Sequence, residues 1–545
     1  MSRVVFVLFI LCCFRVTGLA QVAPPPLPPS PIAADTMRLV EILNADKNGF
    51  RRIDSTTELQ MLVGNVRLKE ASSLFYCDSA VYNKSLHIIE AFGNVHINDA
   101  DTVNTYAQYL LYYVDTRIAI LKKKVKLTDG HSSLFSEEVQ YDMNQKIGEY
   151  HNGGRVVNGE SVLTSREATY YADLKDVYFK KNVVLTDPKY ILKTDSLLYN
   201  TDNELATFIA QTLIEDSAHR KIKTTDGFYD LKNKKAYLNK RSTIEDGAVK
   251  VVANEIQTDD NTGKNILKGN AVYTDTAQGI SVLANLIEAN RKEGNFRATQ
   301  HPLMILKQEA DSIYITADTL FSGKLSLLPM AKDSIVLKDT IKGTMVMAVN
   351  EPKKEDSSDR YFQAYRNVRI FSDSLQAVSD SLFYSGKDSI FKLFQESIVW
   401  ANDNQVTGDT IYLFTKNKKA ERLNVFENGF LINKSGENMY NQIRGNRLFG
   451  YFKDGTIDYM RAKGNAESIY YIKDEDSSLV GLNKASGDII DLRFKDKALH
   501  EVVFINEVKG TMYPMSQVPE AERTLRNFKW LDVRRPKTKF ELFGD

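Results

Sequence analysis

The sequence predicts an all-β, elongated repeat protein of antiparallel strands, and three observations support this prediction. A phrase that is usually Gly-Asn followed by an alternating apolar pair recurs about every thirty residues along the 545-residue chain. The segments between copies are rich in Val, Ile, Thr, Tyr and Phe and end at Asn, Asp, Lys and Gly clusters, as strands and turns do. Helix signals are nearly absent before Pro514. A fixed period of roughly twenty to fifty residues indicates stacked units with an elongated interior rather than one globular pocket.

The first twenty residues are predicted to be a secretory signal peptide. Arg3 supplies the positive end, Val4–Phe14 is a short apolar run, and Gly18-Leu19-Ala20 has the small-x-small pattern of a cleavage site. An uncleaved anchor is the alternative, although the run is short for a stable membrane span. Residues 21–37 begin with QVAPPPLPPS and are predicted to be an extended, proline-rich linker.

Composition excludes several classes of protein. Beyond the signal peptide only Cys77 remains, so the exported chain can form no intramolecular disulfide and no Cys-based zinc site. We expect Cys77 to be a small buried or half-buried strand residue. Lys plus Arg is 71 and Asp plus Glu is 70, so net charge does not point to nucleic acid. No later apolar stretch reaches eighteen residues, and we expect a soluble or peripheral chain.

The repeated phrase itself predicts two facing sheets. Copies begin at residues 64, 93, 123, 154, 181, 211, 241 and 269, so their starts differ by 29, 30, 31, 27, 30, 30 and 28 residues. In Asn-Val-x-Leu the two apolar side chains are two residues apart and point to one face, while the residue between them points outward, as Arg67 and Lys126 do. The recurring glycines Gly64, Gly93, Gly154 and Gly269 are predicted to mark a bend or bulge between the sheets. The candidates for an apolar groove between them are Val66, Leu68, Val95, Ile97, Val125, Leu127, Val183, Leu185, Val272, Val368 and Ile370.

The rhythm divides the chain into regions with about thirteen units in all, the first near Val40. Residues 38–310 hold the regular N-terminal repeats, and residues 311–364 hold an irregular repeat with a charged loop insertion, EPKKEDSSD, near its end. The period resumes over residues 365–510. Residues 511–545 form a tail in which PEAERTLRNF predicts a short helix, with Pro519 in its first turn.

No catalytic, metal or cofactor motif emerges from the sequence. There is no G-x-S-x-G, P-loop or G-x-G-x-x-G, and the seven His are scattered without the spacing of a metal pair. Asp259–Gly263 resembles a fragment of a calcium loop but lacks the closing Glu, which favours a plain turn. The repeated Asp in T-D-S-L and G-D-T-I recurs in unit after unit, which indicates a scaffold role rather than paired catalytic carboxylates. We therefore predict a protein that is not an enzyme.

The phrases LVGNVRL, FGNVHI, LKGNAVYTD, KTDSLLYN and TADTLF, recurring after a signal peptide, resemble the OstA/LptA family of lipopolysaccharide-export proteins. The resemblance covers roughly residues 40–471 and extends toward 510. It implies a β-jellyroll in which two antiparallel sheets meet as a V, a periplasmic location, and an apolar inner face that carries lipid A acyl chains toward the outer membrane. It also implies lipopolysaccharide and other transport proteins as partners, the latter by stacking of edge strands. This chain is longer than many family members, and it lacks the membrane anchor and the transmembrane strands of two relatives.

Three functions remain open at this point. The first is a lipid-conducting bridge, and the second is a structural or adhesive β-solenoid with a closed, dry core. The third, a polysaccharide-acting β-helix enzyme, would need an exposed cluster of Asp, Lys, Arg or His that breaks the repeat. Whether the Val/Leu columns line an open groove or interlock across a closed one distinguishes the first two.

Overall fold

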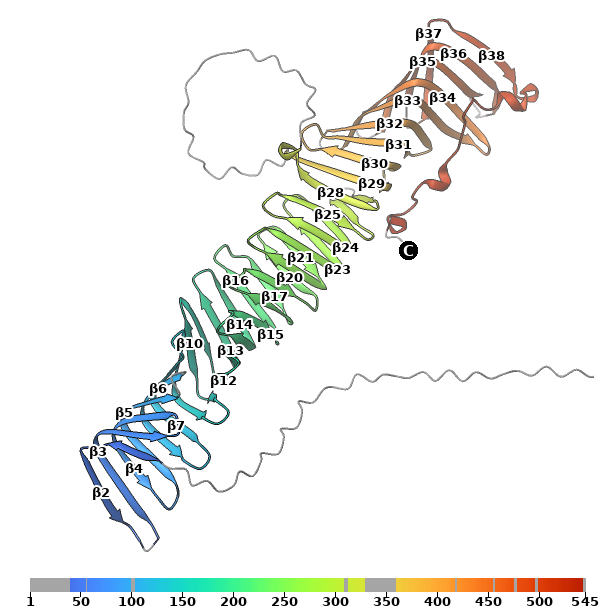
Figure 1. The fold of residues 1–545 in the computed structure, drawn as a ribbon. Coiled ribbons are helices and arrows are strands. Elements are labelled where there is room, and N and C mark those ends of the chain that lie inside the picture. Colours follow the sequence, from blue (N-terminus) through green and yellow to red (C-terminus); the bar gives the residue numbers. More distant parts are fainter. Residues whose placement is uncertain are drawn as a thin grey trace, which may run out of the picture.

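The computed structural model describes residues 40–54, 56–99, 103–307, 312–328, 359–416, 419–453, 456–474, 478–495 and 498–542. These residues form an elongated stack of antiparallel strands (Figure 1), which confirms the predicted all-β repeat architecture. Within these ranges no helix has the length and apolar character needed to cross a bilayer. Residues 1–39, which include the predicted signal peptide and the predicted linker over residues 21–37, lie outside the described residues, as do residues 329–358, which make up most of the insertion.

The strands of the N-terminal part are β1 Glu41–Asn44, β2 Lys47–Arg52, β3 Glu58–Glu70, β4 Ser73–Asn83, β5 Ile88–Asp99, β6 Val103–Tyr113, β7 Ile118–Thr128, β8 Ser132–Asp142, β9 Ile147–Tyr150, β10 Gly154–Asn158, β11 Ser161–Ser165, β12 Glu167–Tyr171, β13 Asp176–Asp187, β14 Tyr190–Asn200, β15 Leu205–Phe208, β16 Thr212–Asp216, β17 Lys221–Thr224, β18 Gly227–Asp230, β19 Lys235–Leu238, β20 Ser242–Asp246, β21 Val249–Ala253, β22 Glu255–Asp259, β23 Lys264–Asp275, β24 Ile280–Asn290, β25 Asn295–Thr299, β26 Leu303–Lys307, β27 Ser312–Thr316 and β28 Thr319–Lys324.

The C-terminal strands are β29 Arg360–Phe371, β30 Gln376–Ser385, β31 Ile390–Ala401, β32 Asn404–Lys416, β33 Lys419–Gly436, β34 Met439–Lys453, β35 Thr456–Lys473, β36 Leu479–Lys495, β37 Ala498–Ile505 and β38 Lys509–Pro514. Short 3₁₀ turns are η1 Leu325–Leu327, η2 Met515–Gln517, η3 Glu520–Glu522, η4 Asp532–Arg534 and η5 Lys539–Leu542.

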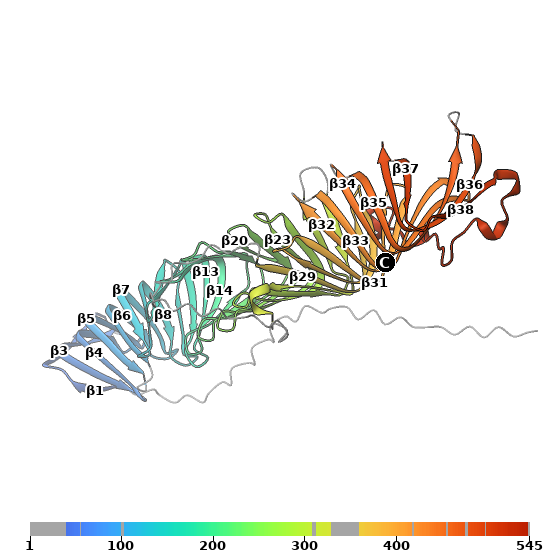
Figure 2. The ribbon, with the colours of Figure 1, turned by 90° about the horizontal axis from the view of Figure 1, so that it is seen from above.

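The long strands cross from one sheet to the other, with a shift of register at the crossing. In β3, residues 58–63 pair with β2 and residues 67–69 pair with β1, and the pairing with β4 shifts between Val63 and Val66. We call the half that begins with β2 and ends with β37 sheet 1, and the half that begins with β1 and ends with β38 sheet 2. Figure 2 shows the stack from above, with β37 and β38 on separate arms at its C-terminal end.

The Gly-Asn phrase forms the corner between the two sheets. Gly64 and Asn65 both have left-handed backbone conformations, with φ of 81° and 46°, a region that glycine and asparagine tolerate best. A Cβ on Gly64 would lie 2.2 Å from Oδ2 of Asp46, and Asn65 donates a hydrogen bond of 3.1 Å to the same oxygen. The same Asn–Asp bond recurs at later corners: Asn94 to Asp78, Asn367 to Asp318 and Asn428 to Asp409. The repeated aspartates are therefore corner residues, as their recurrence in successive units indicates.

The prediction for Gly154 was wrong. Gly154 lies inside β10, and the left-handed residue is its neighbour Gly153, with φ of 96°. A Cβ on Gly154 would lie 2.6 Å from the ring of Tyr150, so close packing rather than a bend requires glycine here.

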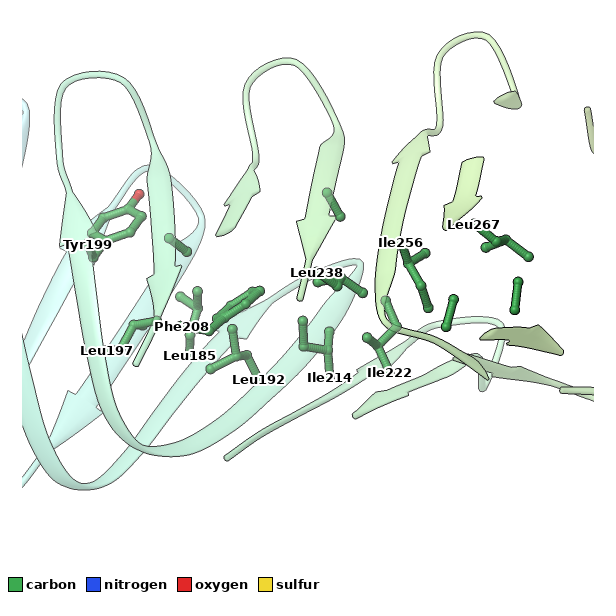
Figure 3. Close-up of a cluster of buried hydrophobic side chains, with 14 of the residues drawn as sticks. Leu185, Leu192, Leu197, Tyr199, Phe208, Ile214, Ile222, Leu238, Ile256 and Leu267 are labelled. Atoms are coloured by element: carbon green, nitrogen blue, oxygen red, sulfur yellow. The ribbon is translucent and has the colours of Figure 1, made fainter. Parts of the chain in front are cut away.

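The core is one continuous cluster of apolar side chains between the sheets, running from Leu62 to Phe494. Figure 3 shows a part of it: Leu185, Leu192 and Ile214 from sheet 2 point toward side chains of sheet 1. Cys77 belongs to this cluster and is buried, as predicted, and burial raises the pKa of its thiol to about 12.

The short helix predicted in PEAERTLRNF is present only as the 3₁₀ turn η3, which directly follows Pro519. The tail runs back along the outer face of sheet 2 toward β29 (Figure 1). Leu525 and Val518 pack against a group of apolar residues from β33, β35 and β36, and Leu531 packs against Val378, Ile398 and Trp400. Burial against the sheet holds the segment extended in place of a helix.

Three buried glutamines of sheet 2 hold the tail, two of them through its main chain and one through a side chain. Gln405 Oε1 accepts a hydrogen bond of 2.7 Å from the N–H of Leu531, and its Nε2 donates one of 2.8 Å to the carbonyl of Lys529. Gln442 makes the same pair of bonds, both 2.8 Å long, with the N–H of Leu525 and the carbonyl of Arg523. Gln376 accepts two hydrogen bonds from the guanidinium of Arg535.

Candidate functional site

The predicted groove residues lie in the interior between the sheets, with one exception. Ten of the eleven belong to the core cluster, with exposed fractions from 1% to 7%. Val272 is only half-buried, because in the phrase GNAVY the interior position after Asn is Ala271, at 1% exposure. Because side chains alternate along a strand, Val272 points outward. The predicted groove position in this phrase was therefore wrong by one residue. The ten buried residues are Val66, Leu68, Val95, Ile97, Val125, Leu127, Val183, Leu185, Val368 and Ile370.

The N-terminal interior is closely packed. A void of about 20 Å³ lies between Leu127, Leu134, Val156 and neighbouring residues, which is room for about one water molecule. An acyl chain could contact Leu127 or Leu185 only if the two sheets moved apart.

Polar contacts join the two sheets on the side opposite the corners, which we call the mouth. At the end of β3, Glu70 accepts a hydrogen bond of 2.6 Å from the hydroxyl of Tyr112, and Arg117 Nε lies 3.2 Å from the same carboxylate oxygen. Glu70 belongs to sheet 2, whereas Tyr112 and Arg117 come from the end of β6 and the following turn, in sheet 1. Burial, and then the bond to Glu70, raise the pKa of Tyr112. The hydroxyl therefore stays protonated and donates.

Asp129 and Tyr170 repeat this arrangement further along the mouth. The Tyr170 hydroxyl donates to Asp129 at 3.3 Å, and Lys175 Nζ lies 3.8 Å from the same carboxylate. Burial alone would raise the pKa of Asp129. Hydrogen bonds from the N–H groups of Ser132 and His131, with Lys175 and Tyr170, outweigh burial and hold this pKa below its ordinary value. Asp129 is therefore a carboxylate that accepts across the mouth.

Two further contacts continue the series. Asn158 Nδ2 donates to the Tyr199 hydroxyl at 3.2 Å. Beyond it, Arg220 lies 2.9 Å from Asp216 and 3.4 Å from Asp260, which also binds Arg291 at 2.6 Å. We call the groups at Glu70, Asp129, Asn158 and Arg220 the cross-mouth contacts. In each, a sheet 2 residue binds a sheet 1 residue 40 to 47 positions later.

A cavity of about 530 Å³ lies in the middle of the stack, between β23 and β32. Its apolar lining comes from both sheets and is rich in aromatic residues: Tyr273, Ile280, Met304, Leu306 and Ile313 from sheet 2, and Phe296, Phe362, Tyr384 and Phe391 from sheet 1. The volume lies in the range of pockets that hold small-molecule ligands.

The ends of the strands supply charged groups to this cavity. Lys307 ends β26, Arg360 begins β29 and Asp275 ends β23, so all three lie at the mouth. Arg360 is oriented by a hydrogen bond of 2.6 Å to the carbonyl of Gly294. The cavity thus combines an apolar interior with two cations and one carboxylate near its opening.

Neither the cross-mouth residues nor the cavity was predicted from the sequence. A signal for the former exists, since Tyr112, Tyr141, Tyr170 and Tyr199 follow one another at intervals of 29 residues. The cavity leaves no such periodic trace, because its lining spans the irregular region around the insertion. Across the ranges that the structure describes, no group of three His, Cys, Asp or Glu side chains is placed to hold a metal ion. Asp259 forms a plain turn, accepting from the N–H groups of Asn261 and Thr262.

Comparison with known proteins finds a family model that matches part of the chain. Residues 37–195 match the family model of OstA-like proteins. The predicted resemblance to the OstA/LptA family is thereby confirmed, and the corners and paired sheets of this region continue beyond residue 195.

A solved structure that matches is LptH from Pseudomonas aeruginosa, described as the LptA-homologous periplasmic component of the lipopolysaccharide transport device. The sequence identity is 15%, the match covers 20% of this chain and 80% of LptH, and the TM-score is 0.18. No curated protein matches the chain.

Proposed function

We propose that this chain is a periplasmic bridge component that carries lipopolysaccharide toward the outer membrane, with lipid A acyl chains held between the two sheets. The OstA-like region supports a transport role of this class. The observation that favours lipid carriage most is the cavity of about 530 Å³, because it is an unfilled part of an otherwise continuous apolar interior.

The chemistry of the cavity fits an anionic amphiphile. Burial of an acyl chain against Phe362, Met304 and their neighbours gains roughly 25 cal/mol per Å² of apolar surface, and smooth apolar walls do not fix the chain in one place. Lys307 and Arg360 at the opening can bind phosphate groups of the head group, Arg360 with two parallel hydrogen bonds. In this proposal the protein moves the lipid without chemical change, so it is a carrier rather than an enzyme.

Partners would attach at the ends of the stack. β1 and β2 at one end and β37 and β38 at the other each have a neighbour on one side only in the described structure. Edge strands of this kind accept a further strand by main-chain hydrogen bonding. We propose that other lipopolysaccharide-transport proteins dock there.

A closed structural solenoid is the second candidate. The close packing of Leu68, Ile97 and Leu185 and the cross-mouth contacts favour it. The cavity favours the bridge, since a purely structural stack gains stability from a filled core.

Photo-crosslinking to lipopolysaccharide distinguishes the two candidates. A photoreactive residue is placed singly at Met304, Phe391, Leu68 or Leu185, with Arg67 as the control on the outer face, and the exported proteins are irradiated in cells. The bridge predicts lipid adducts at Met304 and Phe391 and none at Arg67. A folded, exported protein without adducts at any interior position would support the closed solenoid.

A further inference from the structure

We propose that the cross-mouth contacts control where lipid enters the interior: acyl chains enter from the side at the central cavity, and they reach the N-terminal interior only where these contacts open. This inference rests on the proposed lipid-carrying function and adds a gating role for Tyr112, Tyr170 and the groups that they bind.

The cross-mouth contacts share one position in the fold although their side chains differ. Their chemistry varies, from tyrosine–carboxylate at Glu70 and Asp129 to amide–hydroxyl at Asn158 and an arginine network at Arg220. Their place does not vary, since each joins a strand end or turn of sheet 2 to a strand end or turn of sheet 1 across the mouth. Different side chains that perform the same bridging at four places along the mouth indicate that closure of the mouth is the shared feature.

Two tyrosines of the cross-mouth contacts are buried between the sheets. Tyr112 and Tyr170 are buried, with 0% and 5% exposure, and their rings fill the space between the sheets just inside the mouth. The hydroxyl of each ring binds a carboxylate of the opposite sheet. A lipid chain that enters from the side would have to displace the ring and break that bond.

The row of short turns on the sheet 1 side of the mouth is interrupted next to the residues that line the cavity. On the sheet 1 side, the turns after β22 and β24 are short, and they supply Asp260 and Arg291. The next connection on this side, between β28 and β29, is the insertion that spans residues 325–359. Arg360, which lines the cavity, is the first residue after this connection. The insertion thus interrupts the spacing of about forty residues that brings cross-mouth partners together.

The energetic balance suits a gate that opens one contact at a time. A single charge-assisted hydrogen bond is worth about as much as the burial of a few methylene groups. An advancing acyl chain can therefore replace one contact, whereas opening the whole mouth at once would require several to break together. Removing the hydroxyl while keeping the ring should lower the barrier without creating a cavity.

The test uses the full-length exported protein with lipopolysaccharide as the probe. A photoreactive residue is placed at Leu127, inside the contact at Asp129, or at Met304 in the cavity. Each reporter is combined with Tyr112→Phe and Tyr170→Phe together. The matched control is Tyr237→Phe, a half-exposed tyrosine of sheet 1 that stacks on Phe228 at 4.7 Å on the outer face. Circular dichroism and thermal unfolding establish that each variant is folded.

In the otherwise unchanged protein, we expect adducts at Met304 to exceed those at Leu127 at least fivefold. The double Tyr→Phe variant should raise the Leu127 adducts at least threefold and leave Met304 unchanged, and Tyr237→Phe should change neither. Equal labelling of both positions in the unchanged protein would overturn the gating inference alone, as would a double variant without effect. Absence of adducts at Met304 and Leu127 in every folded variant would overturn the proposed function, and the inference with it.

Discussion

The N-terminal and C-terminal parts of the stack use the same repeat but are stabilised from different sides. From β3 to β23, contacts across the mouth join the two sheets, and the described part of the tail ends beside β27 and β29. From β30 to β36 the tail covers the outer face of sheet 2, and several strands are longer, with 18 residues in β33 and β35 against 12 in β5. The difference shows that the V of two sheets has a second stabilising element besides its core. In the N-terminal part this element is the set of cross-mouth contacts, and in the C-terminal part it is the tail.

One row of side chains shows this difference directly. In the N-terminal part, neighbouring strands place Tyr76, His96 and Tyr106 side by side on the outer face, with ring centroids 5.3 and 4.5 Å apart. These rings stack on one another and need no cover. In the C-terminal part, neighbouring outer positions hold Trp400 and Gln405, which the tail buries. The outer face is thus self-sufficient in one part and dependent on the tail in the other.

Removal of residues 515–545 should produce the largest effect and should divide the molecule in two. Trp400, Ile432 and Tyr471 would lose their cover, and burial of such side chains contributes roughly 1.5–3 kcal/mol each. We expect the C-terminal part to lose on the order of 5 kcal/mol or more, measured as faster amide hydrogen exchange in β31–β36. Exchange in β5–β14 should not change, and a uniform increase along the whole stack would contradict this division.

Gln405→Ala and Gln442→Ala should each have an intermediate effect. Each substitution leaves one tail N–H and one carbonyl without the partners seen here, at a cost of about 1–3 kcal/mol. Limited proteolysis should cut the tail faster in both variants. Asn48→Ala, in β2 at the opposite end of the stack, is the comparison. A tail as resistant as in the unchanged protein would show that apolar contacts alone hold it.

Tyr112→Phe should have a smaller effect, confined to the N-terminal part. Glu70 would keep Arg117 but lose the tyrosine hydroxyl, which we estimate at about 1–2 kcal/mol in denaturant unfolding. Tyr237→Phe should stay within roughly 0.5 kcal/mol of the unchanged protein. If the two substitutions gave equal losses, the contact at Glu70 would contribute nothing beyond burial of the ring.

The pH dependence that comes from Asp129 should be the smallest effect. Because its pKa is lowered in the folded protein, its carboxylate stabilises the fold above the pKa of the unfolded chain, and this contribution disappears as the pH falls through the folded pKa. Unfolding midpoints between about pH 6 and pH 2.5 should therefore fall less steeply for Asp129→Asn than for the unchanged protein. Parallel curves would mean that Asp129 is not ionised across the mouth.

The repeat made the fold predictable, and it also explains what was missed. Val66 and Leu68 were assigned to the interior because alternation in a strand is strict. The same rule misassigned Val272, because the apolar phrase there begins with Ala271. Long-range features were not accessible in this way. The path of the tail depends on Gln405 and Gln442, which lie more than 80 residues from the main-chain atoms that they bind, and no local pattern predicts such a contact.

The tail can dock only after the strands that it covers have been synthesised. A chain is synthesised from its N-terminus, and its early units can fold as they emerge. Residues 515–542 follow every strand that they cover, so the outer face around Trp400 stays uncovered until the last part of the polypeptide arrives. During that interval a chaperone that binds exposed aromatic surface would find its site on the C-terminal layers. A chain interrupted before the tail would keep that aromatic surface exposed.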